Sequence, residues 1–286
     1  LDLSSNRFEE VPEVVCGLGA LVDVNLNHNH IRRLGNSLRS LGELTYMRLG
    51  SNRIGELPSS VGHMTGLMEL DLSENRLRAV GLEDVGRLSY LGKLDLTGNR
   101  LRELPDAVVA ELTCLQEVLL SHNRLERLPS TLQHCTQLEV LSARGNHLQR
   151  LVEVSSLVRL RYLDLSDNCL VKLPDTLGTL TNLEHLNLSF NRLERLPDAL
   201  GMLQDLNALL LAHNRLQKLP KSVGKLCEVQ VLHASHNRLS DLPDNLTQMR
   251  RLRELYLADN AFKQVPDVFT RLVRLRAADL SDNPLS

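Results

Sequence analysis

Four histidines are the residues of this sequence whose type and spacing could support chemistry. They are His185, His213, His233 and His236, and all four fall where a repeated strand pattern predicts outward side chains. A zinc site would need three or four ligands that converge on one point. Exposed histidines on solvated strands need no such convergence. We interpret the four in this second way and expect no metal site, although imidazole groups on a binding surface could make binding depend on pH.

Catalytic motifs are missing from the sequence. It has no GxSxG nucleophile elbow, phosphate-binding P-loop, HExxH zinc helix or EF-hand loop. The pair Gly17 and Gly19 lacks the third glycine of a dinucleotide-binding turn. We therefore expect no enzyme activity and no cofactor in this chain. One alternative stays open: the chain could target the catalytic domain of a larger phosphatase, kinase or ubiquitin ligase.

The composition of the chain indicates which kinds of partner and which cellular compartment to expect. Lys and Arg number 33 against 35 Asp and Glu, so the chain lacks the basic excess of a general nucleic-acid binder. Its longest apolar stretches, such as residues 208–212, are far shorter than the roughly 20 residues that span a bilayer. The five cysteines are scattered without a CxxC pair, which favours a reducing compartment. We expect a cytoplasmic protein with no transmembrane segment.

Asparagines recur at matching places along the whole chain, and most steps between them are 23 residues. They are residues 6, 29, 52, 75, 99, 123, 146, 168, 191, 214, 237, 260 and 283. Before each of them runs the pattern LxxLxLxxN, as in LEHLNLSFN (183–191). A buried amide must be hydrogen-bonded, and an asparagine side chain can satisfy backbone groups at a bend. We therefore interpret the asparagines as structural.

Each repeat is predicted to contain a short strand followed by a turn. The alternation points Leu186 and Leu188 inward and leaves the residues between them on an outward face. Nine of the ten prolines lie six residues after an asparagine, where a proline marks the turn into an outer segment. Stacking of the repeats closes the core. The sequence thus predicts an α/β solenoid, a horseshoe with a parallel sheet on the concave face and short helices, 3-10 turns or loops on the convex side.

The motif LxxLxLxxN resembles the leucine-rich repeat family over the whole chain. The strings LPDTLGTLTNL (173–183) and LPDALGMLQDL (196–206) resemble its intracellular Ras-associated class, which includes Ras suppressor, Scribble, Erbin and the plant Ras-group-related proteins. The expected proline is absent at Gly35, Gly81 and Val152. The resemblance implies a cytoplasmic scaffold near small GTPases or membrane junctions. We predict one domain over residues 1–286, of about thirteen repeats, and expect a fragment of a longer protein because neither end carries an evident polar cap.

The outward strand positions are predicted to form an acidic surface. Of 51 such positions, thirteen hold acidic and three hold basic residues, whereas the rest of the chain has a basic excess. An acidic groove attracts basic protein surfaces and repels phosphate backbones. We expect a protein partner on this face and no nucleic acid. Part of the acidity is typical of the family, because Asp71, Asp95, Asp164 and Asp279 occupy a position where the repeat often has aspartate.

Repeats 9 to 12 also place apolar side chains on this face, where the pattern would permit polar ones. Exposed apolar patches and aromatic side chains mark binding surfaces. We expect Tyr256, Leu210 and Phe190 to anchor a partner and the carboxylates at positions 164, 167, 254 and 259 to orient it. The predicted partner-binding residues are Tyr162, Asp164, Asp167, Phe190, Leu210, Val231, His233, Glu254, Tyr256 and Asp259.

The sequence therefore predicts a non-catalytic scaffold or adaptor in intracellular signal transduction, and the resemblance implies a small GTPase or a phosphatase as its partner. An extracellular receptor ectodomain is the rival interpretation, and it would carry glycans at Asn187 or Asn245. A basic ridge at residues 251, 253, 274 and 276 is a further surface, where an acidic partner or anionic lipid could dock in a peripheral membrane contact. An ordinary solvated flank is the alternative for that ridge.

Overall fold

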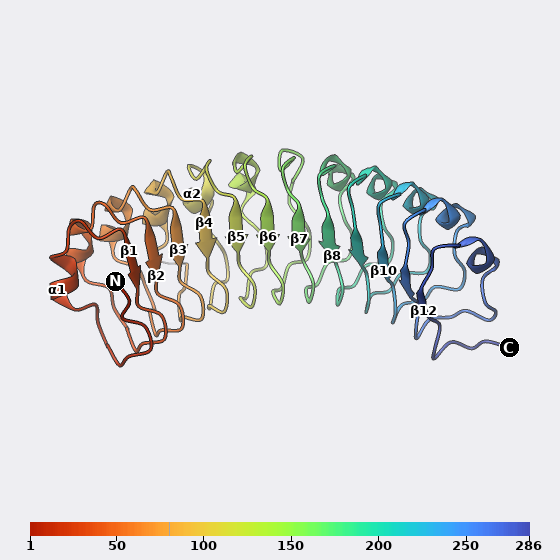
Figure 1. Cartoon of the computed structure of the whole chain (residues 1–286), viewed down its shortest axis with the longest axis horizontal. Helices are drawn as coiled ribbons and strands as arrows, with labels where there is room; N and C mark the ends of the chain where they lie inside the picture. Colours follow the sequence, from red (N-terminus) through yellow and green to blue (C-terminus); the bar gives the residue numbers. More distant parts are fainter. Residues whose placement is uncertain (80) are drawn as a thin grey trace. The chain divides into compact units, whose positions relative to one another are not determined.

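The computed structural model describes residues 1–79 and 81–286, which form short strands joined by turns and 3-10 helices (Figure 1). These residues fall into two compact units, Leu1–Asn146 and His147–Ser286. They contain twelve strands, two α-helices and nine 3-10 helices. Within this described part, no helix is both long and apolar enough to cross a bilayer. The prediction of one domain over residues 1–286 stays a prediction.

Strands and helices alternate along both units. The first unit contains α1 (Glu13–Cys16), β1 (Asp23–Asn25), η1 (Asn36–Ser40), β2 (Tyr46–Arg48), η2 (Ser59–His63), β3 (Glu69–Asp71), η3 (Glu83–Arg87), β4 (Lys93–Asp95), α2 (Asp106–Val109), β5 (Glu117–Leu119), η4 (Ser130–His134) and β6 (Val140–Ser142). The second unit contains β7 (Tyr162–Asp164), η5 (Asp175–Thr179), β8 (His185–Asn187), η6 (Asp198–Met202), β9 (Ala208–Leu210), η7 (Lys221–Lys225), β10 (Val231–His233), η8 (Asp244–Gln248), β11 (Glu254–Tyr256), η9 (Asp267–Arg271) and β12 (Ala277–Asp279). Within each unit, every strand pairs in parallel with the next one in the chain. The predicted solenoid of parallel strands is confirmed.

The core of each unit is a stack of leucine rows. The middle residue of nearly every strand is buried while its two neighbours are half-buried, as the alternation predicts. Leu186 in β8 and Leu188 just after it are both fully buried. Each repeat contributes equivalent leucines to this interior, so a repeat is stabilised mainly by the repeats on either side of it.

The repeated asparagines bridge successive repeats, which confirms their structural role. Nδ2 of Asn191 donates to the carbonyls of Leu188 in its own repeat and of Leu165 in the preceding one, at 3.1 and 2.9 Å. Its Oδ1 accepts the backbone N–H of Leu170, also in the preceding repeat, at 2.9 Å. Because the side chain is buried, these bonds replace contacts that the backbone groups would otherwise make with water.

Proline fixes the start of the segment that returns to the next strand. Each of the nine prolines directly precedes a short helix and leaves the backbone extended at that point, as Pro197 does before η6. Its carbonyl then accepts the first N–H of the turn, that of Leu200, at 3.1 Å. At Val152, where the proline is absent, the described residues between Leu151 and Leu160 form turns and no helix.

Candidate functional site

Three rows of side chains on the second unit lie outside the leucine core, and we call them together the outer strand face. The first row is formed by the first residue of each strand: Tyr162, His185, Ala208, Val231, Glu254 and Ala277. The second row is formed by the third residue: Asp164, Asn187, Leu210, His233, Tyr256 and Asp279. The third row precedes each asparagine: Asp167, Phe190, His213, His236, Asp259 and Asp282. All ten predicted partner-binding residues fall in these rows.

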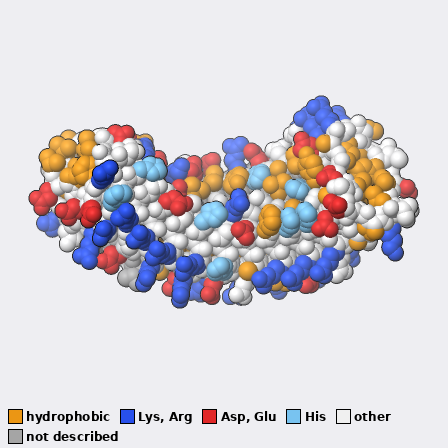
Figure 2. Space-filling model, turned by 90° about the horizontal axis from the view of Figure 1, so that it is seen from below, with side chains coloured by type: hydrophobic (Ala, Val, Ile, Leu, Met, Phe, Trp, Pro, Cys, Tyr) orange, Lys and Arg blue, Asp and Glu red, His pale blue; other side chains and the backbone are white. Residues whose placement is uncertain are grey.

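The predicted anchors lie on adjoining repeats. Strand register places His233 directly between Leu210 and Tyr256 in the second row, and all three side chains are half-buried. Phe190 in the third row is 53% exposed, which is unusual for a large aromatic side chain in a folded chain. Figure 2 shows hydrophobic side chains beside histidines over the second unit, towards the right of the view.

A stack of rings runs along the third row. The ring centroids of Phe190 and His213 are 4.1 Å apart and those of His213 and His236 are 3.9 Å apart, with nearly parallel planes in both pairs. The stack ends on a carboxylate, because Nδ1 of His236 lies 2.8 Å from Oδ2 of Asp259. All four residues have positive φ, the left-handed backbone conformation that turns the chain after the strand. The regular bend therefore brings side chains 23 residues apart into face-to-face contact.

Two further aromatic pairs lie within the rows, one in the first row and one in the second. Tyr162 stacks on His185 with centroids 4.8 Å apart, and His233 meets Tyr256 edge-on at 5.3 Å. The Tyr256 hydroxyl donates to Oε2 of Glu254 at 3.0 Å, which raises the pKa of that hydroxyl. The two pairs thereby form an apolar surface, and the carboxylate of Glu254 lies at its edge.

Asp164 does not take the outward role that the sequence predicted for it. Its side chain is buried, and Oδ1 accepts both the backbone N–H and the hydroxyl of Ser166, at 2.9 and 2.6 Å. The same turn-closing bonds join Asp71 to Ser73 and Asp279 to Ser281. Aspartate at this position forms hydrogen bonds within its own turn, so we exclude Asp164 from the partner-binding residues.

This turn-closing role makes the other residues of the second row informative. Asn187 follows the same rule, since its Oδ1 accepts the N–H of Ser189 at 3.1 Å. Leu210, His233 and Tyr256 hold this position in three consecutive repeats. Leu210 has no acceptor atom. Among the described residues neither the His233 ring nor the Tyr256 hydroxyl accepts an N–H of its own turn, and that hydroxyl bonds to Glu254 instead. No requirement of the repeat calls for them, so they are the strongest candidates for contact with a partner.

Three histidines of the outer strand face have surroundings that favour the neutral ring. Burial lowers the pKa of His185, His213 and His233, and the neighbouring imidazoles lower that of His213 further. Nowhere in residues 1–79 and 81–286 do three or more His, Cys, Asp or Glu side chains converge as metal ligands would. Among the histidines only His233 was predicted to bind a partner. The ring contacts add His185, His213 and His236. For His213 and His236 the signal was their equivalent position in consecutive repeats.

The predicted basic ridge lies beside the outer strand face on the last two repeats. All four arginines are exposed, and Arg251 also pairs with Glu228 at 2.6 Å. A compact group of Lys and Arg side chains is visible over this end of the second unit in Figure 2.

Comparison with known proteins agrees with this geometry. A family model described as leucine rich repeat matches residues 42–101, 89–148, 158–216 and 227–285. The structure of a leucine-rich-repeat protein of Leptospira interrogans superposes with a TM-score of 0.93 at 30% identity, over 98% of this chain and 71% of that chain. A TDR receptor structure gives 0.87 at 25% identity, over 99% and 53%. The PEPR1–AtPEP1 structure gives 0.87 at 28% identity, over 98% and 41%. The chain therefore spans about half or less of the last two proteins.

Proposed function

Because the chain belongs to the leucine-rich repeat family, we propose that it is a non-catalytic scaffold that holds a protein partner on the outer strand face of its second unit. One observation carries this proposal. Leu210, His233 and Tyr256 replace turn-closing residues in three consecutive repeats. A few anchor side chains, most often Trp, Tyr and Arg, supply most of the binding energy in protein interfaces, and Tyr256 is such a residue. Phe190 in the neighbouring row extends the same apolar patch.

The proposed partner has a basic surface around an apolar centre. Glu254, Asp167 and Asp259 surround the patch, and Asp167 and Asp259 are exposed. Charge complementarity at the rim of an interface accelerates association and excludes partners of the wrong sign. These carboxylates also disfavour nucleic acid on this face, because its phosphates would be repelled.

We propose a cytoplasmic setting in signal transduction, with a small GTPase or a phosphatase as partner. The five cysteines are all free, and Cys114 and Cys227 are exposed, which suits a reducing compartment. The resemblance of the LPxxLGxL strings to the Ras-associated class supports the pathway. A role as the targeting arm of a larger enzyme is compatible with the same surface.

An extracellular receptor ectodomain is the second candidate function. It is favoured by the similarity to the TDR receptor, at 25% identity over 99% of this chain. In that case the outer strand face would hold a secreted peptide or protein. The chemistry of the patch would be unchanged, and only the compartment and the partner would differ.

The proposal is tested by capture of partners from cytosolic extract and from conditioned medium, followed by mass spectrometry and by titration of the captured protein. The site variant carries Leu210→Arg and Tyr256→Arg. A matched control carries Tyr46→Arg and Leu119→Arg, which place the same charge in the first and second strand rows of the first unit. Circular dichroism must show that both variants are folded.

We expect the parent and the control to bind a common cytosolic partner and the site variant to bind it at least about tenfold more weakly. Equal binding by the site variant would move the interface away from the outer strand face. A partner found only in conditioned medium, and lost in the site variant, would support the receptor function instead.

A further inference from the structure

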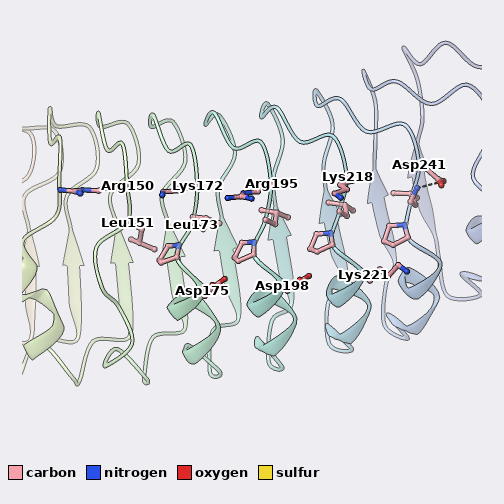
Figure 3. Close-up of a pocket in the computed structure, with 17 residues that line it drawn as sticks. Arg150, Leu151, Lys172, Leu173, Asp175, Arg195, Asp198, Lys218, Lys221 and Asp241 are labelled. Carbon is pink, nitrogen blue, oxygen red and sulfur yellow. Dashed lines mark hydrogen bonds between the residues drawn. The ribbon is translucent and has the colours of Figure 1, made fainter.

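A second surface of the second unit is a groove on the turn that follows each asparagine (Figure 3). It has a volume of about 1070 Å³ and crosses five successive repeats. Its floor consists of Leu151, Leu173, Pro174, Leu196, Pro197, Leu219, Pro220, Leu242 and Pro243. The leucines are buried and the prolines half-buried, so the floor is apolar. None of these residues belongs to the outer strand face.

The two walls of the groove differ in charge over four of its five repeats, and in the fifth repeat the basic row ends at Asp241. One wall is a row of basic side chains at the same position of four successive repeats: Arg150, Lys172, Arg195 and Lys218. All four are exposed, and none has an ion-pair partner in the part of the chain that the structure describes. Asp175 and Asp198 lie on the other side of the row of prolines, and Lys221 follows them (Figure 3).

The uninterrupted basic row is not a property of the repeat itself. In the first unit the same position holds Glu10, Arg33, Glu56, Ala79, Glu103 and Arg127. Glutamate and arginine are interspersed there, and Glu103 and Arg127 lie 3.8 Å apart as an ion pair. Four like charges on neighbouring repeats repel one another, so the second unit keeps an arrangement that costs stability. An anionic ligand bound along the row would offset the repulsion among these four side chains.

The shape and the charge of the groove favour an extended acidic polypeptide over other anions. Stacked strands are about 4.8 Å apart, so four repeats spread their charges over about 14 Å, the length of about five residues of extended chain. Alternate side chains of such a segment can lie on the leucine and proline floor. A nucleic acid has no apolar side chains for that floor, whereas an extended acidic polypeptide can turn its carboxylates to the basic wall and its apolar side chains to the floor.

We propose that this groove binds an extended acidic segment of a partner protein. Carboxylates of the segment pair with Arg150, Lys172, Arg195 and Lys218, and its apolar side chains cover the floor. Arginine binds carboxylates through two parallel hydrogen bonds, which gives the row geometric as well as electrostatic selectivity. The groove is a second interaction surface, separate from the face that we propose for the main partner.

Fluorescence anisotropy tests the proposal with a set of labelled octapeptides in which glutamate alternates with valine, leucine or phenylalanine. The matched control peptides carry glutamine in place of glutamate, and a single-stranded oligonucleotide of equal charge serves as a general polyanion. The intact chain should bind at least one acidic peptide, more tightly than its glutamine counterpart and more tightly than the oligonucleotide.

Three variants locate the binding site. Reversal of the wall, K172E with R195E, should weaken binding of the acidic peptide about tenfold or more. The control places two charge reversals far along the first unit, R32E with R33E, and should change binding less than about twofold. Removal of the opposing carboxylates, D175N with D198N, should strengthen binding, a gain that misfolding cannot imitate. Each of four results would overturn the proposal. The chain binds no acidic peptide, binds the glutamine peptide as tightly as the acidic one, or binds the oligonucleotide more tightly than the acidic peptide. The fourth is that K172E with R195E binds the acidic peptide as tightly as the parent.

Discussion

At the scale of single residues, the asparagine at the end of each strand motif links one repeat to the next. Asn191 uses both ends of its amide, and all four of its partners are backbone groups in a buried environment. Loss of the amide would leave the N–H of Leu170 without a partner, which costs about 1–3 kcal/mol for a buried group. The carbonyls of Leu165 and Leu188 would each lose one of two donors and keep Asn168 and Asn214, at about 0.5–1.5 kcal/mol for each lost bond. The asparagine at position 6 is different, because it is exposed and bonds only to Leu3 and Ser4 in its own repeat.

We therefore expect Asn191→Ala to lower the free energy of unfolding by about 2–4 kcal/mol. Asn6→Ala should lower it by less than about 1 kcal/mol, since water can replace the lost bonds. Urea unfolding followed by circular dichroism measures both. A cost at Asn191 as small as that at Asn6 would contradict the bridging role.

Histidine titration is the second effect at this scale. The pKa of His213 lies below its ordinary value of 6.5, mainly because of burial, although Asp259 opposes the shift. The unfolded chain therefore takes up this proton at a higher pH than the folded chain does. The stability that the neutral ring contributes is fully present above about pH 6.5 and is lost as the pH falls from there to the lower pKa of the folded state. His185 and His233 act in the same direction.

His213→Phe should make the stability of the chain less dependent on pH. The phenyl ring can still stack between Phe190 and His236, and it has no proton to gain. We expect the loss of unfolding free energy between pH 7.5 and 5.5 to be smaller in the variant than in the parent. Urea titrations at both values measure it, and an unchanged loss would show that His213 does not contribute.

At the scale of elements, the glycine of the LPxxLGxL strings sets how closely successive 3-10 helices stack. A Cβ atom on Gly224 in η7 would lie 2.1 Å from the carbonyl oxygen of Asn245 in η8. Gly201 in η6 and Gly178 in η5 are equally tight against the backbone of the next helix, with closest distances of 2.4 and 2.6 Å. The neighbouring atoms belong to the backbone and not to a movable side chain, so a larger residue forces the helices apart.

Gly224→Ala should consequently destabilise the second unit by about 1–3 kcal/mol, the usual cost of overpacking. The control is Gly55→Ala, because a Cβ atom there meets nothing within 4 Å. Thermal unfolding of the two variants provides the comparison. If Gly55→Ala proves as harmful as Gly224→Ala, helix stacking is not the reason for the glycine.

At the scale of the whole molecule, charge is divided between different rows of one repeat. The outer strand face combines an apolar patch with carboxylates such as Glu254 and Asp259, whereas the groove after the asparagines presents a basic wall. The two surfaces lie at different positions of the repeat and share no residue. One chain could therefore bind a basic partner and an acidic segment at the same time.

Because the two surfaces share no residue, we expect substitutions in one surface to leave ligand binding at the other unchanged. K172E with R195E should change binding of the main partner less than about twofold, and Leu210→Arg with Tyr256→Arg should leave the affinity for the acidic peptide equally unchanged. The two binding assays described above measure these four combinations. A large effect of one pair of substitutions on both ligands would show that the ligands compete or that the variant is misfolded.

The sequence by itself determined the repeat, its strands and the direction in which their side chains point. Successive side chains of a strand point to opposite faces. The repeated leucines such as Leu186 therefore point inward, and a residue next to one of them, such as Tyr256, points outward. The asparagines and prolines could be assigned for the same reason. The asparagines bond to backbone groups at the bend and the prolines fix the turn that follows, and both needs recur in every repeat.

Only the tertiary structure decided what lies next to what across repeats. Burial of Asp164, the ring stack from Phe190 to His236 and the unpaired basic wall of the groove depend on side-chain directions and on stacking of residues about 23 positions apart. A one-dimensional pattern lists which residues occupy equivalent positions. Whether those residues stack, pair or remain free depends on distances of a few ångströms, which are set by the packing of whole repeats.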